Sequence, residues 1–230
     1  MGNSEFISAK KSALEKYFGR LNEMQKQAVF TVNGPVLILA GAGSGKTSVL
    51  VNRIINMVRF GNVYNDITER FDITNDDIEF LNNYDGSTDD ASLSKLVDLV
   101  SSNCIKPWNI LAITFTNKAA GELKERLETA LGANALDVNA STFHSACMRI
   151  LRRDINRLGY ESNFTIYDSD DSQRLLKGCY DPLDINDKQF PPKSIANVIS
   201  SAKDKLISPA VFEAHATGDY RKSTIAKLYK

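Results

Sequence analysis

One stretch of the chain, Gly41–Thr47 (GAGSGKT), constrains the fold more than any other. Together with Ala40 it fits the phosphate-loop pattern [AG]-x-x-x-x-G-K-[ST], with alanine at the first fixed position, and its glycines let the backbone approach a phosphate chain. The apolar run Val36–Ala40 precedes it and predicts a buried parallel strand. Apolar residues at helical spacing follow it from Val49 to Met57. This order of strand, loop and helix brings backbone N–H groups and the positive end of a helix dipole onto an anion. We therefore expect an α/β fold with a phosphate-binding loop.

Two residues of this loop are candidates for the chemistry. Lys46 would reach the β- and γ-phosphates, and the Thr47 hydroxyl would bind a Mg²⁺ ion that keeps most of its waters. The alternative is an ordinary glycine-rich turn. A chance match to the four fixed positions occurs in roughly one chain per hundred of this length, and the flanking elements make it rarer. The loop does not choose between kinases, ATPases, GTPases and helicases.

Composition excludes several classes of protein. The 230 residues are 43% hydrophobic, which suits a globular protein with a core, and no apolar run is long enough to span a bilayer. The N-terminus lacks a signal-peptide core, and the three cysteines are widely spaced without metal-ligand patterns. We expect a cytoplasmic protein with reduced thiols, no membrane partner and no zinc site.

The net charge of zero hides an uneven distribution. Residues 65–100 contain ten acids and two bases, a balance of −8, so the remaining residues carry +8. The surrounding segment, residues 60–106, is rich in Asn and Asp, with short helices expected near 74–84 and 92–100 and a solvated loop between them. We interpret it as an acidic insertion without a chemical role of its own.

A glutamine lies just ahead of the first strand. Asn22 can cap a short helix that carries Gln25. The amide of Gln25 both donates and accepts hydrogen bonds, so it could read the N6/N7 edge of adenine. Alternatively, Gln25 faces solvent.

Two further strands are expected, at 107–115 and 136–140. The first leads through Phe115, Thr116 and Asn117 into a helix, and the second leads into a helix that continues to about Leu158. The carboxyl ends of such strands are where open α/β sheets bind ligands. Phe115 could stack on a nucleic-acid base there, or belong to the core.

The helix after the third strand carries four arginines, Arg149, Arg152, Arg153 and Arg157. They form either a solvated face or a set of phosphate contacts. His144, at the start of this helix, is a capping residue or a ligand contact. Beyond Gly159 we expect one short strand, 163–167, and then helices near 169–179, 192–206, 209–216 and 219–230, forming a separate and mainly helical subdomain.

Taken together and in order, these blocks resemble the N-terminal part of superfamily 1 DNA helicases of the UvrD/Rep/PcrA type. Leu21–Val29 is similar to the Q motif of that family and Ala40–Thr47 to its motif I. Ile113–Ala120 is similar to motif Ia and Ser141–Ser145 to motif Ib, while Ile195–Pro209 resembles the helical 1B subdomain. The resemblance runs from about residue 21 to residue 230, interrupted by the acidic segment.

The resemblance implies a RecA-like P-loop NTPase fold, with a parallel sheet flanked by helices. Subdomain 1A would span 1–145 with the insertion at 60–106, and the mainly helical 1B would span 146–230. It implies that ATP and Mg²⁺ are bound by Gln25, Ala40, Gly41, Ala42, Gly43, Ser44, Gly45, Lys46, Thr47, Ser48 and Arg53, with Thr47 on the metal. It implies that DNA is bound by Phe115, Thr116, Asn117, Thr142, Phe143 and His144. The implied partners are single-stranded DNA, duplex junctions and the rest of a helicase chain with its second motor domain.

The sequence departs from the family pattern in two respects. The helix after motif I is joined to motif Ia by the long segment 60–106 instead of a short connection. No acid pair follows an apolar strand after His144, and Asp170–Asp171 lies in the helical tail. Without that carboxylate Mg²⁺ lacks its second anchor, so we expect this chain to be an N-terminal fragment of a 3′–5′ DNA helicase that binds ATP weakly and hydrolyses almost none.

Three other hypotheses stay open. The chain could be a stand-alone nucleotide- and DNA-binding module that regulates, or part of a recombination helicase–nuclease subunit. A small-molecule P-loop kinase would require a substrate lid and an acceptor site, which the sequence does not offer.

Overall fold

The computed structural model describes residues 2–41, 43–68, 70 and 72–230. They divide into two compact units between Asp154 and Ile155. Helix α7 (Phe143–Asp154) belongs to the first unit, because it packs on the two β-strands of that unit. The division therefore falls after this helix and not before residue 146, where the sequence placed the subdomain boundary.

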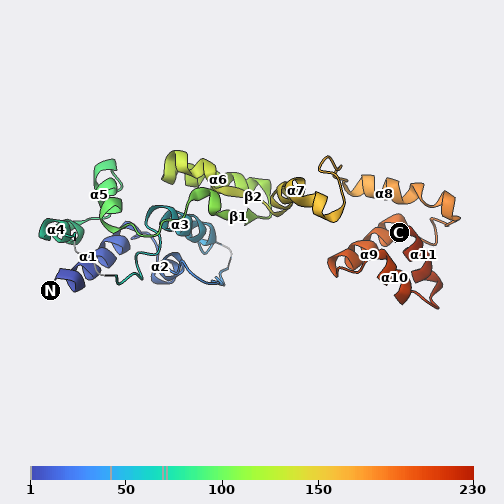
Figure 1. The fold of residues 1–230 in the computed structure, drawn as a ribbon, viewed down its shortest axis with the longest axis horizontal. Coiled ribbons are helices and arrows are strands. Elements are labelled where there is room, and N and C mark those ends of the chain that lie inside the picture. The colour runs from blue at the N-terminus through green and yellow to red at the C-terminus, as the bar shows by residue number, and fades with distance from the viewer. Residues whose placement is uncertain (1, 42, 69, 71) are drawn as a thin grey trace. The chain divides into compact units, whose positions relative to one another are not determined.

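The first unit consists of helices around a small parallel sheet (Figure 1). Its elements are α1 (Gly2–Tyr17), α2 (Glu23–Phe30), α3 (Lys46–Arg59), α4 (Asn75–Asn83), α5 (Asp90–Val100), the 3₁₀ turn η1 (Pro107–Asn109), β1 (Leu111–Thr114), α6 (Asn117–Leu131), the 3₁₀ turn η2 (Gly132–Asp137), β2 (Asn139–Thr142) and α7.

The sheet pairs β1 with β2 in parallel. Leu111 lies opposite Asn139 and Thr114 lies opposite Thr142, so the carboxyl ends of both strands are neighbours. Helix α6 forms the crossover between them and packs on both strands. A hydrophobic core joins the strands to α3 and α6. The members of this core are Val51, Ile54, Ile55, Ile110, Ala112, Leu123, Leu127, Leu131, Ala135, Val138 and Ala140.

The strand expected at Val36–Ala40 is not formed, and that prediction is wrong for this chain. The segment runs without strand pairing, and Leu37 and Leu39 are 83% and 87% exposed. An apolar run signals a tendency to be buried, but a strand also needs neighbours to take its N–H and C=O groups. Among the described residues, β1 and β2 pair only with each other.

Three other strand predictions need correction. Residues 163–167 form no strand, and the strand expected at 136–140 begins at Asn139. The backbone of the preceding residues forms η2, whose 3₁₀ turns delay the strand until Asn139. The strand expected at 107–115 likewise shortens to β1, because its first residues form η1 around Pro107.

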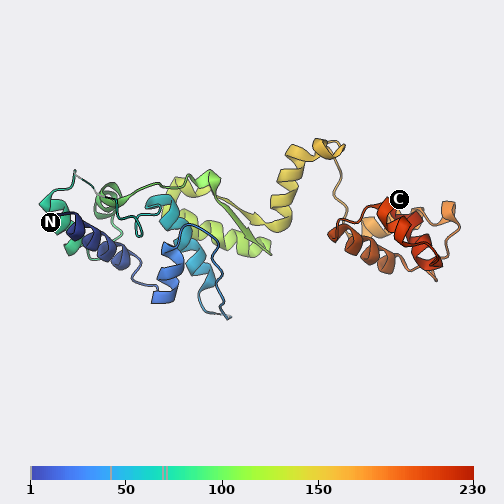
Figure 2. The same ribbon diagram turned by 60° about the horizontal axis from the view of Figure 1, so that its bottom comes forward.

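The acidic segment is folded and shares a core with the rest of the unit. Helices α4 and α5 occur close to where the sequence places them, and α1 packs beside α4 (Figures 1 and 2). Leu81 of α4 and Leu96 of α5 are fully buried, in a core that also contains Phe6, Ala9, Ala13, Leu14, Phe18, Leu21, Val29, Phe30, Val49, Phe60, Val63, Ile78, Tyr84 and Val100. The two expected helices are therefore confirmed, and the segment that carries them is part of the core of the first unit.

The two ends of the acidic segment lie side by side. The Ser102 N–H donates to the Phe60 carbonyl at 3.0 Å, and Gly61 forms an isolated parallel bridge with Ser102. Gly61 has φ +73°, and a Cβ placed on it would lie 1.9 Å from the Ser102 carbonyl oxygen. This close backbone approach explains the glycine.

The second unit is helical. Its elements are the 3₁₀ turn η3 (Ile155–Leu158), α8 (Ser169–Gly178), the 3₁₀ turn η4 (Asp181–Leu183), α9 (Pro192–Asp204), α10 (Pro209–His215) and α11 (Tyr220–Tyr229). Leu176, Tyr180, Phe190, Ile195, Ile225 and Leu228 form its core. The helices expected in this region are confirmed. Within the described part of both units, no helix is long and apolar enough to cross a membrane.

Candidate nucleotide and nucleic-acid site

The loop Gly41–Thr47 ends at the N-terminus of α3, as the sequence predicts. Gly43 and Gly45 take φ +75° and +86°, and Gly45 caps the helix without a side-chain hydrogen bond. The first N–H groups of α3 therefore have no side-chain cap, and they lie at the positive end of the helix dipole. This arrangement suits a phosphate oxygen. Ala42, which the resemblance assigns to this loop, lies outside the described residues.

In this structure the loop is folded onto itself. The carbonyl of Gly41 accepts hydrogen bonds from the Lys46 ammonium at 2.7 Å and from the Ser44 hydroxyl at 2.7 Å. Lys46 also donates to the Ala40 carbonyl at 3.0 Å. Lys46, Thr47 and Ser44 are all exposed to solvent. A phosphate chain can therefore reach them, but Lys46 would have to exchange its two carbonyl partners for phosphate oxygens.

Gln25 lies beside this loop and both ends of its amide are engaged. Its Oε1 accepts from the Asn22 N–H at 3.0 Å, which completes the capping box of α2. Its Nε2 donates to the Ser44 carbonyl at 3.2 Å. The predicted cap at Asn22 is confirmed. The alternative that Gln25 merely faces solvent is wrong, because it joins α2 to the phosphate loop.

The side chain of Arg53 is turned toward the end of α2. Its guanidinium donates to the backbone carbonyls of Ala28 and Val32, and its burial lowers its pKa. Arg53 thus holds α2 against α3 in this structure.

Sequence reasoning missed a second residue with the same task. Asn56 of α3 is buried, and its amide donates to the carbonyls of Val29 and Gly61 at 3.2 and 3.3 Å. Within the described part of the chain its Oδ1 has no partner. Burying an amide on the apolar face of a helix is costly unless it is hydrogen-bonded. The position of an asparagine among the apolar residues of α3 is therefore the sequence feature that could have identified Asn56.

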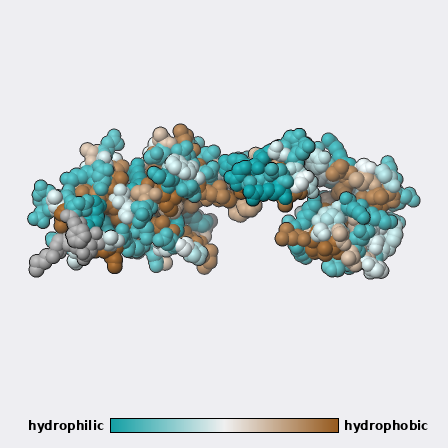
Figure 3. All heavy atoms as spheres, viewed as in Figure 1, coloured by the Kyte–Doolittle hydropathy of each residue, from teal (hydrophilic) through white to brown (hydrophobic). Residues whose placement is uncertain are grey.

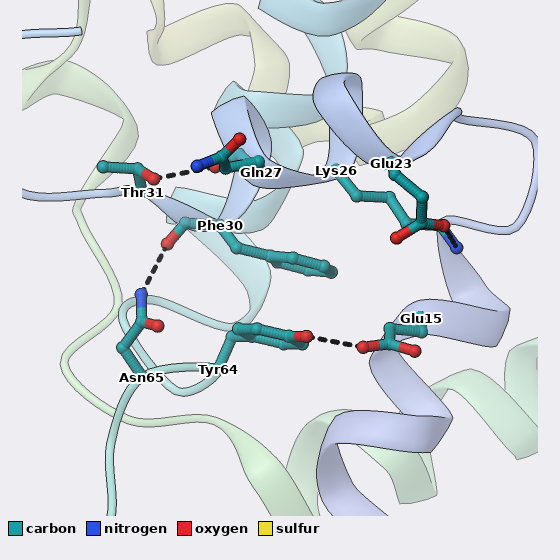
Figure 4. A pocket seen from close by; sticks show the side chains of 8 residues that line it. All are labelled: Glu15, Glu23, Lys26, Gln27, Phe30, Thr31, Tyr64 and Asn65. Carbon is teal, nitrogen blue, oxygen red and sulfur yellow. Dashed lines mark hydrogen bonds and ion pairs between the residues drawn. The ribbon is translucent and has the colours of Figure 1, made fainter.

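The opposite face of α2 borders a separate pocket of about 190 Å³ (Figure 4). Its floor is a stacked pair of rings, Phe30 and Tyr64, 3.9 Å apart and parallel. The Tyr64 hydroxyl donates to Glu15 of α1, and burial together with this bond raises the pKa of Tyr64 to about 12. Asn65 donates to the Phe30 carbonyl at 3.0 Å. These contacts hold the face of α2 that is opposite Gln25.

The second predicted group of residues lies at the carboxyl ends of β1 and β2. Phe115 follows β1 and is 97% exposed, so the alternative that it belongs to the core is wrong. The Thr116 hydroxyl accepts from the Ala119 N–H at 3.1 Å and caps α6, and Asn117 begins that helix. An exposed aromatic ring beside a helix N-terminus can stack on a base while the N–H groups face a phosphate.

The end of β2 presents the other three residues differently. Phe143 is 56% exposed and His144 is exposed, whereas Thr142 is 8% exposed. The Thr142 hydroxyl accepts from the Ser145 N–H at 3.2 Å, so it caps the first turn of α7. Because Thr142 lies opposite Thr114 in the sheet, both chain segments leave it at the same edge.

Helix α7 carries the arginine-rich face. Hydrophilic residues gather over this helix in Figure 3. Arg149 donates to the Ser141 hydroxyl at 2.9 Å, and Arg153 pairs with Asp154 at 2.8 Å while 77% of its side chain stays exposed. Arg152 is exposed on the same helix. Basic side chains therefore extend from the sheet edge along α7.

Comparison with known proteins decides the family. The model of the UvrD/REP helicase N-terminal domain matches residues 21–67 and 93–230 of this chain. The chain belongs to the UvrD/REP helicase family. The match covers the phosphate loop, Gln25 and both strand ends, and it omits residues 1–20 and 68–92.

Individual relatives agree with this assignment. The chain is 42% identical over 209 residues to a Bacillus subtilis (strain 168) protein named ATP-dependent DNA helicase PcrA. It is 37% identical over 209 residues to the protein of the same name from Staphylococcus aureus strain Mu50. The alignments cover 91% of this chain but only 22% and 23% of these relatives. The chain therefore spans less than a quarter of the length of the proteins it matches.

Proposed function

We propose that this chain is the ATP- and single-stranded-DNA-binding N-terminal part of an ATP-dependent 3′–5′ DNA helicase or translocase that acts in DNA repair or replication. The observation that supports it most is the uncapped N-terminus of α3, with Lys46 exposed and Gln25 bonded to the same loop. The family membership and the names of the relatives support the helicase assignment.

Residues of α2, of α3 and of the phosphate loop before α3 would hold the nucleotide. Gln25 would bond the adenine edge, with Arg53 near the base, and the loop Ala40–Ser48 would surround the phosphates. Lys46 would donate to the β- and γ-phosphates, and the Thr47 hydroxyl would hold Mg²⁺. Bound Mg²⁺ neutralises charge on the phosphate oxygens, which is the chemistry it supplies. Thr47 fits this task because its side chain is exposed at the first turn of α3.

Single-stranded DNA would follow the edge formed by the ends of β1 and β2. Phe115 and Phe143 would stack on bases, and Thr116, Asn117 and His144 would bond the backbone. Thr142 would act through the cap of α7, since its hydroxyl is already bonded to Ser145. Duplex junctions and the second motor domain would be the further partners of the complete helicase.

Residues 1–230 alone would bind ATP weakly and hydrolyse almost none. The acid pair that the tail offers, Asp170 and Asp171, lies in the first turn of α8 in the second unit. There the Asp171 carboxylate accepts from the Asp168 N–H at 3.3 Å and completes a capping box. It follows no strand, so it supports no role as the second Mg²⁺ anchor.

Binding of a fluorescent ATP analogue to residues 1–230 tests the proposal. Lys46→Ala should weaken binding at least about tenfold, because a charge-assisted contact to phosphate contributes about 1.5–3 kcal/mol. Lys227→Ala removes an exposed lysine of α11 and is the matched control, which should bind as the unaltered chain does. Equal affinity of the Lys46 variant would refute the nucleotide site. DNA-stimulated hydrolysis by residues 1–230 that Lys46→Ala abolished would refute the proposed inactivity.

A further inference from the structure

The two segments that the family model omits meet in space. Residues 1–20 contain α1 and residues 68–92 contain α4, and these two helices pack side by side (Figures 1 and 2). The Lys16 ammonium of α1 donates to the Asn82 carbonyl of α4 at 2.9 Å. A Cβ on Gly86, just after α4, would lie 2.7 Å from the Lys16 carbonyl oxygen. We call the described residues of 2–20 and 68–92, without 69 and 71, the accessory lobe, because together they form one addition to the family domain.

A groove of about 400 Å³ lies between the two helices of the accessory lobe. It is lined by Glu5 of α1 and by Asn75, Ile78, Glu79, Asn82 and Asn83 of α4. Four of these, at positions 75, 78, 79 and 82, recur at helical spacing and so form one face of α4. Ile78 is 8% exposed and forms the floor, whereas the polar residues are exposed.

The chemistry of the groove suits one class of ligand. Glu5 and Glu79 accept hydrogen bonds from cations, and the asparagine amides both donate and accept, as the main chain of a peptide requires. Helix α4 lies in residues 65–100, which carry ten acids and two bases, whereas residues 2–20 carry two acids and four bases, so the two segments together have a balance of −6. The field around it therefore attracts basic partners and repels nucleic acid. The Lys16 ammonium of α1 is already bonded to the Asn82 carbonyl of α4.

We propose that this groove binds an extended, lysine- or arginine-rich segment of a partner protein. The basic side chains would pair with Glu5 and Glu79, and the asparagines Asn75 and Asn82 would bond the main chain of the segment. The site is separate from the nucleotide loop and from the proposed DNA track, and its residues lie outside the family match. It does not depend on the proposed helicase function.

Fluorescence anisotropy of a labelled peptide of alternating lysine and serine tests the proposal at low salt, using the whole chain. The double variant Glu5→Gln/Glu79→Gln should weaken binding about fivefold or more, since each exposed ion pair contributes up to about a factor of five. Asn82→Ala should weaken binding about threefold without changing the charge. All three altered side chains are exposed, so the fold should be unaffected.

The matched control removes the same charge from the neighbouring helix. Asp90 and Asp98 of α5 are exposed and lie outside the groove, so Asp90→Asn/Asp98→Asn should change peptide affinity less than about twofold. An equal loss in both double variants would overturn the proposal, because binding would then follow the acidic field and not the groove. Absence of peptide binding, or spermine competing as tightly as the peptide, would overturn it too.

Discussion

Replacing Leu81 by alanine tests whether the acidic segment supports the fold of the first unit. Leu81 lies in α4 and is fully buried, in a core that contains residues of α1, α2 and α3 as well. The change removes three carbon atoms from this core, and burial stabilises by about 0.8 kcal/mol for each. The transfer contribution is therefore about 2.4 kcal/mol.

The cavity left behind raises this cost. Large-to-small replacements of buried leucine destabilise by about 2–5 kcal/mol, because the surroundings close only in part. We expect a loss of about 3–4 kcal/mol in the free energy of unfolding of the first unit. For a unit of this size, that corresponds to a fall of about 10 °C in Tm.

The assay uses the single tryptophan of the chain. Trp108 lies in η1 of the first unit, so its fluorescence during urea denaturation reports on that unit. Trp108 is not a member of the core that contains Leu81, but Tyr17 packs against both cores of the unit, and α3 contributes side chains to both. The Leu81 variant should therefore shift the Trp108 transition together with the far-ultraviolet circular dichroism.

Asn82→Ala is the matched control, because it alters an exposed side chain of the same helix and should change stability by less than about 0.5 kcal/mol. If Leu81→Ala left the Trp108 transition unmoved, the acidic segment would be an independent attachment. The inference of one cooperative unit would then be refuted.

Three further predictions follow from the contacts described above. Gly61→Ala should destabilise the first unit by more than about 2 kcal/mol in thermal unfolding, because its φ is +73° and the new methyl would meet the Ser102 carbonyl; unchanged Tm would contradict the close approach. Phe115→Ala should weaken single-stranded DNA binding about tenfold in a filter assay, one stacking contact being worth about 1–3 kcal/mol, and an unaltered affinity would remove Phe115 from the track. The pKa of Tyr64 is raised from 10 to about 12, so the unfolded chain loses this proton first. Stability is therefore complete below pH 10 and falls as pH rises toward 12, and Tyr64→Phe should flatten part of that fall in denaturation curves measured across this range.

The phosphate loop shows what local sequence can predict. Its glycines, the helix after it and the capping box at Asn22 all follow from residues within a few positions of one another, and each is present. The exposure of Phe115 was left open, because the same aromatic residue after a strand suits a core as well as a binding edge. Only the packing of α6 on the strands shows that Phe115 points to solvent.

The acidic segment shows what the sequence hides. The sequence predicts its two helices, whose few apolar residues lie at helical spacing. These residues meet α1, which is distant in the chain. Ile78 and Leu81 could be placed on one face of α4 from sequence, yet nothing in it names α1 as their partner. Pairing between distant segments is set by the complete core and not by local propensity.

The strand prediction for Val36–Ala40 failed for the same reason, because pairing depends on distant segments of the chain. Its exposure alternates, with Val36 and Ile38 at 38% and 41% and Leu37 and Leu39 above 80%, so the backbone is extended and keeps one side toward the protein. Parallel strands in α/β proteins are covered on both faces and paired on both edges when central. The apolar side chains of this run therefore suit a position inside a larger sheet.

Gln25 links this local geometry to nucleotide binding. Both ends of its amide already have partners, the Asn22 N–H and the Ser44 carbonyl. Reading adenine would exchange these two hydrogen bonds for two others, and each neutral hydrogen bond contributes only about 1 kcal/mol net. The base would therefore add specificity with little affinity. Helix α2 would stay in place during the exchange, because Arg53 and Asn56 hold its carbonyls from α3. On the proposed function, affinity would then come from the phosphates, through release of Lys46 from the Gly41 carbonyl, so opening of the loop would set how tightly ATP binds.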